Sequence, residues 1–173
     1  MSRIVKILFL SSSLFFFTSC SLGGKRTEML NENEKEKEIN RIDQIISLIE
    51  NKDGESMKAI FSQTVLEEDE NLENEIGYLF DFFQGEVVSC KDSGVGESET
   101  NEYGNKTKKV RSFYKIETDF DSYLVFLFEY TEDTNNSENL GVYSLRIIKE
   151  EDRDTQFTSW QDMVIPGIYM PEK

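Results

Sequence analysis

The apolar residues of this 173-residue chain change their spacing at Gly85, and this change constrains the fold more than any other feature. Before Gly85 they recur every three or four positions, which is the period of one face of a helix. After Gly85 they alternate with polar residues or form short continuous runs, as in strands. Helices followed by strands predict an α+β domain, in which N-terminal helices pack on one face of a curved antiparallel sheet.

Three helices are predicted before Gly85. The first begins at Ile39, and Asp53 is placed to cap a second, shorter helix that fades near Leu66. Glu67 to Glu70 then read as a solvated acidic turn without the ligand spacing of an EF-hand. The apolar face of the first helix is formed by Ile39, Ile42, Ile45, Ile46 and Ile49, and that of the third by Leu72, Ile76, Leu79, Phe80 and Phe83.

Four strands are predicted after Gly85, which ends the third helix where a left-handed residue is often needed. Tyr123 to Phe128 is apolar on both faces, so the third strand is expected at the centre of the sheet. Residues 92–105 contain three glycines and several acids, which indicates a long acidic loop. The predicted strands are residues 86–91, 108–118, 122–130 and 141–149.

The first twenty residues have the composition of an export signal. Arg3 and Lys6 precede Ile7 to Phe17, an uncharged run of eleven residues, which is shorter than the roughly 20 that span a bilayer as a helix. The ending Thr18-Ser19-Cys20 resembles the lipobox of bacterial lipoproteins, although Phe17 stands where Leu is commoner. The resemblance implies cleavage before Cys20 and lipid attachment to its sulfur. An ordinary signal peptide or an uncleaved N-terminal anchor are the alternatives.

The remaining chain has the size of one domain. Removal of residues 1–19 leaves 154 residues, of which 20–38 are polar and form the lipidated cysteine with a flexible tether. Residues 39–173 then form a single α+β domain. The predicted location is the extracytoplasmic face of the cell membrane, where two or more acyl chains on Cys20 give stable attachment.

The strongly acidic composition excludes one class of partner. The formal charge is −15, and loss of Arg3 and Lys6 with the signal takes it to −17. Phosphate backbones and anionic headgroups repel such a chain, so no nucleic acid partner is expected and the lipid alone holds the membrane.

The absence of histidine restricts the chemistry further. Without histidine there is no Ser-His-Asp triad, and the usual zinc ligands and proton shuttle near neutral pH are missing. No metal site and no cofactor are predicted. If Cys20 carries lipid, Cys90 has no disulfide partner, and it is interpreted as a small strand residue and not as a nucleophile.

Several separated segments carry a likeness to a known family. They include FDFFQGEVVSCKDSGVGESET, YLVFLFEYTEDTNNSENLGVYSLRIIKEED and WQDMVIPGIYMP. Over residues 39–171 the chain resembles small Gram-positive lipoproteins that carry an uncharacterised domain. The resemblance implies a cystatin-like, nuclear-transport-factor-two-like cone, and it supplies no reaction and no catalytic residues.

Cones of this kind often enclose a pocket between the sheet and the long helix. The expected ligand contacts are Tyr78, Tyr114, Tyr143, Arg146 and Trp160, with Asp162 from the tail closing the mouth. The alternative is that the tyrosines belong to the core and that Arg146 pairs with Glu117 or Glu129 on a neighbouring strand. The tail around Pro166 is expected to wrap the core as an irregular segment, and an exposed patch for a partner is its alternative.

No catalytic motif is found, so the favoured function is a non-catalytic, membrane-anchored domain that binds a small ligand or a cell-surface protein. The alternative is a small isomerase or hydrolase that uses a carboxylate and a tyrosine inside the cone. The carboxylates available to it are Glu86, Glu117 and Glu129.

Overall fold

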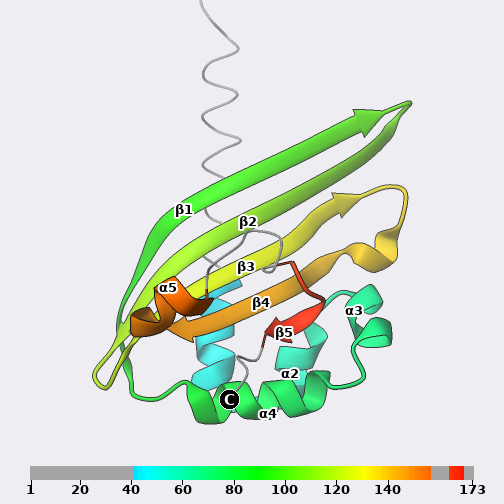
Figure 1. Ribbon diagram of the computed structural model, residues 1–173. Coiled ribbons are helices and arrows are strands. Elements are labelled where there is room, and N and C mark those ends of the chain that lie inside the picture. The colour runs from blue at the N-terminus through cyan, green and yellow to red at the C-terminus, as the bar shows by residue number, and fades with distance from the viewer. Residues whose placement is uncertain (1–40, 157–163, 170–173) are drawn as a thin grey trace, which may run out of the picture. The chain divides into compact units, whose positions relative to one another are not determined.

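The computed structural model describes residues 41–156 and 164–169, all within one compact unit that spans Glu38–Lys173. Helices come first and a five-stranded sheet follows, so the fold class is α+β, as the change of apolar spacing predicts (Figure 1). In the described ranges, no helix is long and apolar enough to cross a membrane.

The first two helices lie where the sequence predicts them in the described part of the chain. Residues 41–50 are helical and bury their isoleucine face against the sheet. The next helix, α2 (Gly54–Ala59), starts at the expected cap, because Asp53 Oδ1 accepts a 3.1 Å hydrogen bond from the backbone N–H of Ser56. This bond satisfies one of the amides that have no partner in the first turn.

The segment predicted as one second helix is in fact two. The chain becomes extended at Ser62, and a separate helix, α3 (Gln63–Glu68), starts there with the Ser62 hydroxyl accepting from Val65 N–H. The interruption forms two backbone hydrogen bonds to the sheet: Ser62 N–H donates to the Val142 carbonyl at 2.9 Å, and Val142 N–H donates to the Ile60 carbonyl at 3.0 Å. Helical spacing of apolar residues does not reveal such a break, because α2 and α3 each bury an apolar residue, Met57 and Val65, in the main core.

Helix α4 (Leu72–Phe82) ends close to the predicted position. Gly85 follows with φ +88°, and a Cβ there would clash with the side chains of Asp119 and Thr118. Only glycine takes this backbone conformation without strain in so little space. The sequence prediction for Gly85 is therefore confirmed.

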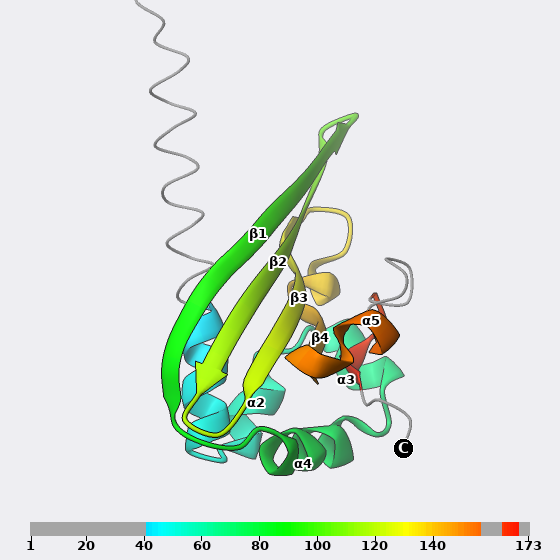
Figure 2. The same ribbon diagram turned by 60° about the vertical axis from the view of Figure 1, so that its left-hand side comes forward.

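The predicted acidic loop at 92–105 is wrong. Strand β1 (Val87–Glu102) runs through it and pairs with β2 (Asn105–Thr118), and the hairpin turns at Tyr103 and Gly104, both with positive φ. Figures 1 and 2 show this hairpin extending well past the end of the third strand. From Cys90 onward β1 is exposed, so it has no apolar face and its sequence carries no alternation.

The other strands are β3 (Ser122–Asp133), β4 (Gly141–Lys149) and β5 (Gly167–Tyr169), and the sheet order is β1-β2-β3-β4-β5. The first four strands are antiparallel, and β3 is central, as predicted. β5 pairs in parallel with β4, so the sheet is mixed. Within the described part of the tail, Gly167–Tyr169 therefore forms a short strand at the sheet edge, where an irregular segment is expected.

The two long edges of the sheet differ. Beside β4, the edge is occupied by β5 and by the Phe61 bridge to Val142. On the opposite edge, β1 pairs with one strand, β2, in the part of the chain that the structure describes. This open edge carries carboxylates at Asp92, Glu97, Glu99 and Glu102.

The main hydrophobic core lies between the helices and one face of the sheet. The other face, called here the outer face, carries a smaller aromatic cluster centred on Phe126 and Phe128, with Phe113, Tyr130, Tyr143 and Val164 packed against them. The central residues of the main core, all 0% exposed, are Ile45, Met57, Val65, Ile116, Tyr123, Val142 and Leu145.

Candidate functional site

The sheet separates the residues that were expected to share one pocket. Tyr114 is 3% exposed and packs in the main core against the helices. Tyr143 stacks edge-on against Phe128 in the aromatic cluster of the outer face. Arg146 pairs across strands with Phe126, and because side chains alternate along a strand it also belongs to the outer face.

The structure describes one of the remaining expected residues, Tyr78. Tyr78 lies on α4 and stacks on Phe82, with ring centroids 5.6 Å apart. Trp160 and Asp162 lie outside the described residues, as does Cys20 with the tether. Among the described residues of this set, the structure therefore brings Tyr143 and Arg146 to the same face of the sheet.

Arg146 does not take the salt-bridge partners considered for it. The residue is 2% exposed, and its guanidinium carbon lies 3.6 Å from the centroid of the Tyr169 ring on β5. Glu129 lies on the core face of β3 and accepts a 3.1 Å hydrogen bond from Arg41 Nε. Glu117 is engaged on β2 by Ser89 and by nearby lysines. Glu129 points to the core face and Arg146 to the outer face, so the sheet lies between the two side chains and they do not pair.

The layer between helices and sheet, where the resemblance implies a cavity, is packed with apolar side chains. Its buried carboxylate, Glu129, is held in an ion pair with Arg41. A described pocket with an apolar wall lies instead on the outer face, under the segment that follows β4.

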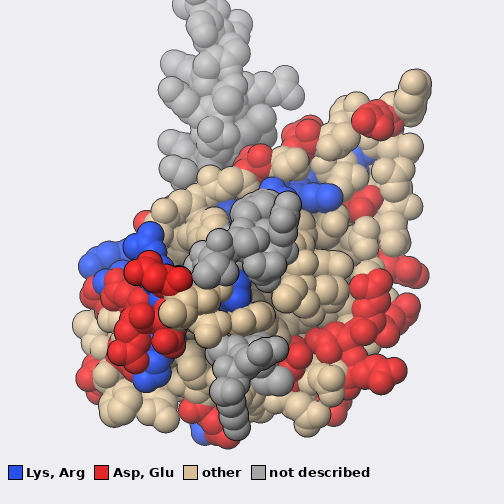
Figure 3. All heavy atoms as spheres, viewed as in Figure 1, with Lys and Arg blue, Asp and Glu red and all other residues tan. Residues whose placement is uncertain are grey.

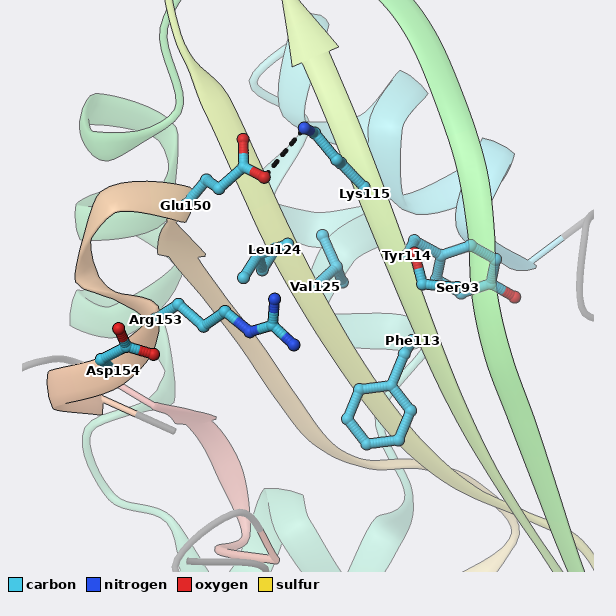
Figure 4. Close-up of a pocket in the computed structure, with 9 residues that line it drawn as sticks. All are labelled: Ser93, Phe113, Tyr114, Lys115, Leu124, Val125, Glu150, Arg153 and Asp154. Carbon is cyan, nitrogen blue, oxygen red and sulfur yellow. Dashed lines mark hydrogen bonds and ion pairs between the residues drawn. The ribbon is translucent and has the colours of Figure 1, made fainter. Parts of the chain in front are cut away.

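This pocket has a volume of about 530 Å³ and lies between the sheet and two short helices, η2 (Glu150–Asp152) and α5 (Arg153–Gln156) (Figure 4). Its size is typical of small-molecule sites, which usually measure roughly 300–1,000 Å³. The lining residues are Ser93, Phe113, Tyr114, Lys115, Leu124, Val125, Glu150, Arg153 and Asp154.

The apolar wall of the pocket is formed by Phe113 and Leu124, both half-buried on the outer face. The Phe113 ring packs against Phe126 with centroids 5.1 Å apart, so the aromatic cluster holds this wall in place. Ser93 contributes a hydroxyl from β1. Tyr114 lines the pocket although its ring lies in the main core.

The charged groups of the pocket are arranged unequally. Lys115 Nζ lies 2.8 Å from Glu150 Oε1 and 3.6 Å from Glu117 Oε1, and the Glu150 hydrogen bond raises the pKa of the Lys115 ammonium. Arg153 has no ion-pair partner among the described residues, and Figure 4 shows its side chain reaching from α5 towards Leu124. Acidic and basic side chains are mixed at this end of the molecule (Figure 3).

A second polar cluster joins α4 to the C-terminal strand. Glu75 Oε2 accepts a 2.9 Å hydrogen bond from Ile168 N–H, and its carboxyl also contacts that of Asp69. Partial burial, together with Asp69, raises the pKa of Glu75 to about 7. No sequence pattern predicts this pair, because Asp69 stands in a run of acids that reads as a solvated turn.

Cys90 shows no sign of activation. It is a free thiol on the exposed strand β1. Desolvation by its neighbours, followed by the carboxylates of Asp43 and Asp92, raises the pKa of the Cys90 thiol. A nucleophilic cysteine needs the opposite shift, because the thiolate is the reactive form.

Comparison with known proteins adds one finding. No curated protein matches the chain. A family model described as "Domain of unknown function (DUF5104)" matches residues 44–150, which cover every described element from the first helix to the start of η2. Lys115 and Glu150 of the pocket lie inside the matched range, and Arg153 lies just beyond it. The match extends over more than half of the chain, which therefore belongs to the DUF5104 family of uncharacterised domains.

Proposed function

We propose that this protein is a lipid-anchored, extracytoplasmic domain that binds a small ligand in the outer-face pocket without chemically changing it. Three features support the anchor: the cationic start, the short apolar run, and the small residues before Cys20. The family resemblance adds a Gram-positive cell as the setting. In such a cell the domain faces outward from the cytoplasmic membrane.

The observation that carries the binding function is the unequal charge of the pocket. The Lys115 ammonium is ion-paired with Glu150, whereas the guanidinium of Arg153 extends over the apolar wall. Pockets that bind small molecules combine an apolar lining with a few polar groups that fix orientation. The pocket has this composition.

The enzymatic alternative needs a carboxylate beside a tyrosine in a cavity between helices and sheet. The buried carboxylate of that layer, Glu129, is paired with Arg41, and the tyrosine of that layer nearest the pocket, Tyr114, is packed among apolar side chains. These contacts favour binding over acid–base catalysis.

We also infer that the domain has the cystatin-like architecture that the resemblance implies. The order of helices before strands and the antiparallel arrangement of β1 to β4 support this inference. A crystal structure of the processed protein, superimposed on cystatin-like folds, tests it. A sheet that does not curve around the α4 side contradicts it.

The anchor is tested by intact-mass analysis of the protein from its own host. The expected mass is that of a chain beginning at Cys20 with added acyl groups, found in the membrane fraction. Cys20→Ser is expected to abolish acylation and leave the precursor uncleaved. A wild-type chain found unacylated in the cytosol contradicts the proposal.

The binding function is tested by native mass spectrometry of the processed protein from its host, looking for a retained small molecule. The adduct is expected to disappear in Arg153→Gln and to survive in Lys52→Gln, which removes one exposed positive charge near Asp81, away from the pocket. An adduct that survives both substitutions lies elsewhere and contradicts the assignment of the site.

A further inference from the structure

The charge and shape of the outer-face pocket restrict the class of ligand. Arg153 is the pocket cation that has no carboxylate partner among the described residues, and it comes from a different element than the apolar wall. Asp154 also lines the pocket, but adjacent residues of a helix point in different directions, so its carboxylate does not lie beside the Arg153 guanidinium. Figure 4 shows the Asp154 carboxylate beside α5 while the guanidinium crosses the pocket.

A guanidinium in this position favours a planar anion. Its N–H groups form two parallel hydrogen bonds with a carboxylate, and such charge-assisted pairs are stronger than neutral ones. The surroundings limit how much negative charge the ligand carries. Glu150 and Asp154 line the same pocket, and the chain as a whole has a charge of −15, so each additional negative charge on a ligand is repelled.

The other end of the ligand must be apolar. Phe113 and Leu124 form adjoining half-buried surfaces on β2 and β3, and their removal from water is favourable when a ligand covers them. The pocket is open on one side, so the apolar part needs to cover these two side chains and not to fill an enclosed cavity.

We infer that the pocket binds a small amphipathic monocarboxylate, with its carboxylate on Arg153 and its apolar part against Phe113 and Leu124. This inference rests on the proposed binding function and names its ligand class. It assigns Arg153 as the residue that selects charge and Phe113 as a residue that contributes affinity without selecting charge.

The test uses two probes that differ in one charge: N-acetyl-L-phenylalanine and its neutral amide, N-acetyl-L-phenylalaninamide. Isothermal titration calorimetry with the processed protein measures both affinities. The acid is expected to bind about tenfold more tightly than the amide, as a charge-assisted hydrogen bond predicts. The lipidated protein is kept in detergent micelles, and these would take up the neutral amide more than the charged acid. Tighter binding of the acid is therefore not an effect of the micelles.

Variants separate the two roles. Arg153→Gln is expected to abolish the preference for the acid, whereas Phe113→Ala weakens both probes and keeps the preference. Lys52→Gln removes a distant positive charge and leaves both affinities unchanged. Circular dichroism confirms that each variant is folded.

Three outcomes overturn the inference. The acid and the amide bind equally to the wild type, the preference survives Arg153→Gln, or the acid does not bind. If the acid fails to bind but native mass spectrometry finds another small molecule that depends on Arg153, the ligand class is wrong and the binding function stands. If no Arg153-dependent adduct is found either, both proposals fall.

Discussion

Glu75 accepts a hydrogen bond from the backbone N–H of Ile168 at 2.9 Å, which ties the middle of α4 to a strand 93 residues later. The neighbouring Gly167 has φ +87°, and its Cα passes so close to the Asp69 carboxylate that a Cβ would clash with it. Two carboxyl groups and the β5 backbone therefore meet in one small volume. Burial of the Glu75 carboxyl, with a smaller contribution from Asp69, raises its pKa to about 7.

The first prediction concerns pH. The folded-state pKa of Glu75 is raised above its unfolded value of 4.5, so its contribution to stability is fully present below pH 4.5 and is lost as the pH rises through about 7. Glu75→Gln stays neutral and keeps an oxygen that accepts from Ile168. The variant is therefore expected to lose less stability than the wild type between pH 5 and 8 in urea unfolding experiments.

Glu73→Gln is the matched control for this prediction, since Glu73 is on the same helix and is exposed. Its hydrogen bond with Lys58 lowers the pKa of Glu73, which places its effect on stability below pH 4.5. Between pH 5 and 8, the free energy of unfolding of Glu73→Gln should change with pH by the same slope as that of the wild type. Equal slopes for Glu75→Gln and wild type would show that Glu75 does not titrate in this range.

The second prediction concerns Gly167. Gly167→Ala places a Cβ against the Asp69 carboxylate in a left-handed backbone conformation, and this strain is expected to cost about 2 kcal/mol or more of the free energy of unfolding. Gly96→Ala is the control, because no atom lies within 4 Å of a Cβ at that position. Urea unfolding measures both, and a Gly167→Ala cost below 0.5 kcal/mol, or about the size of a neutral surface substitution, contradicts the prediction.

The third prediction concerns the ion pair between Arg41 and Glu129. Glu129 is 5% exposed, so Arg41→Met leaves a buried carboxylate without its cation and is expected to cost about 3 kcal/mol. Adding Glu129→Leu should recover most of this loss, because the buried charge is then removed. The exposed pair of Lys58 and Glu73 supplies the comparison, and Lys58→Met should cost much less than Arg41→Met.

The fourth prediction concerns the end of α4. The Tyr123 hydroxyl accepts from Gln84 N–H at 2.9 Å and donates to the Phe82 carbonyl at 3.3 Å, and the residue is 0% exposed. Tyr123→Phe leaves both backbone groups without this partner and is expected to cost about 1–2 kcal/mol. Tyr103→Phe at the exposed hairpin tip should be neutral. Thermal unfolding followed by circular dichroism compares the two variants.

The sequence predicts the elements that bury one face. The helix at 41–50, the cap at Asp53 and the central strand β3 all follow from apolar spacing or from a local hydrogen bond, so neighbouring residues carry the information. The outer part of β1 is missed because it is exposed on both faces and has no apolar period. The break at Ser62 is missed because its cause is a backbone bond to Val142, 80 positions away.

The candidate site was harder to predict than the fold. Phe113 stands opposite the buried Tyr114 in the alternation of β2, and this outward-facing aromatic residue is the one signal for an apolar wall on the outer face. Arg153 stands in a run of acids and carries no such signal. Its position depends on where the chain turns after β4, which the local sequence does not determine.

The acidic open edge of β1 has a consequence for the behaviour of many copies together. An unpaired strand edge is a template for joining sheets between molecules. Charged side chains on an edge strand oppose such joining, and β1 carries Asp92, Glu97, Glu99 and Glu102, of which Glu97 and Glu99 pair with Lys108 and Lys106 on β2. The exposed charged residues of β1 are therefore expected to disfavour edge-to-edge association of the sheets.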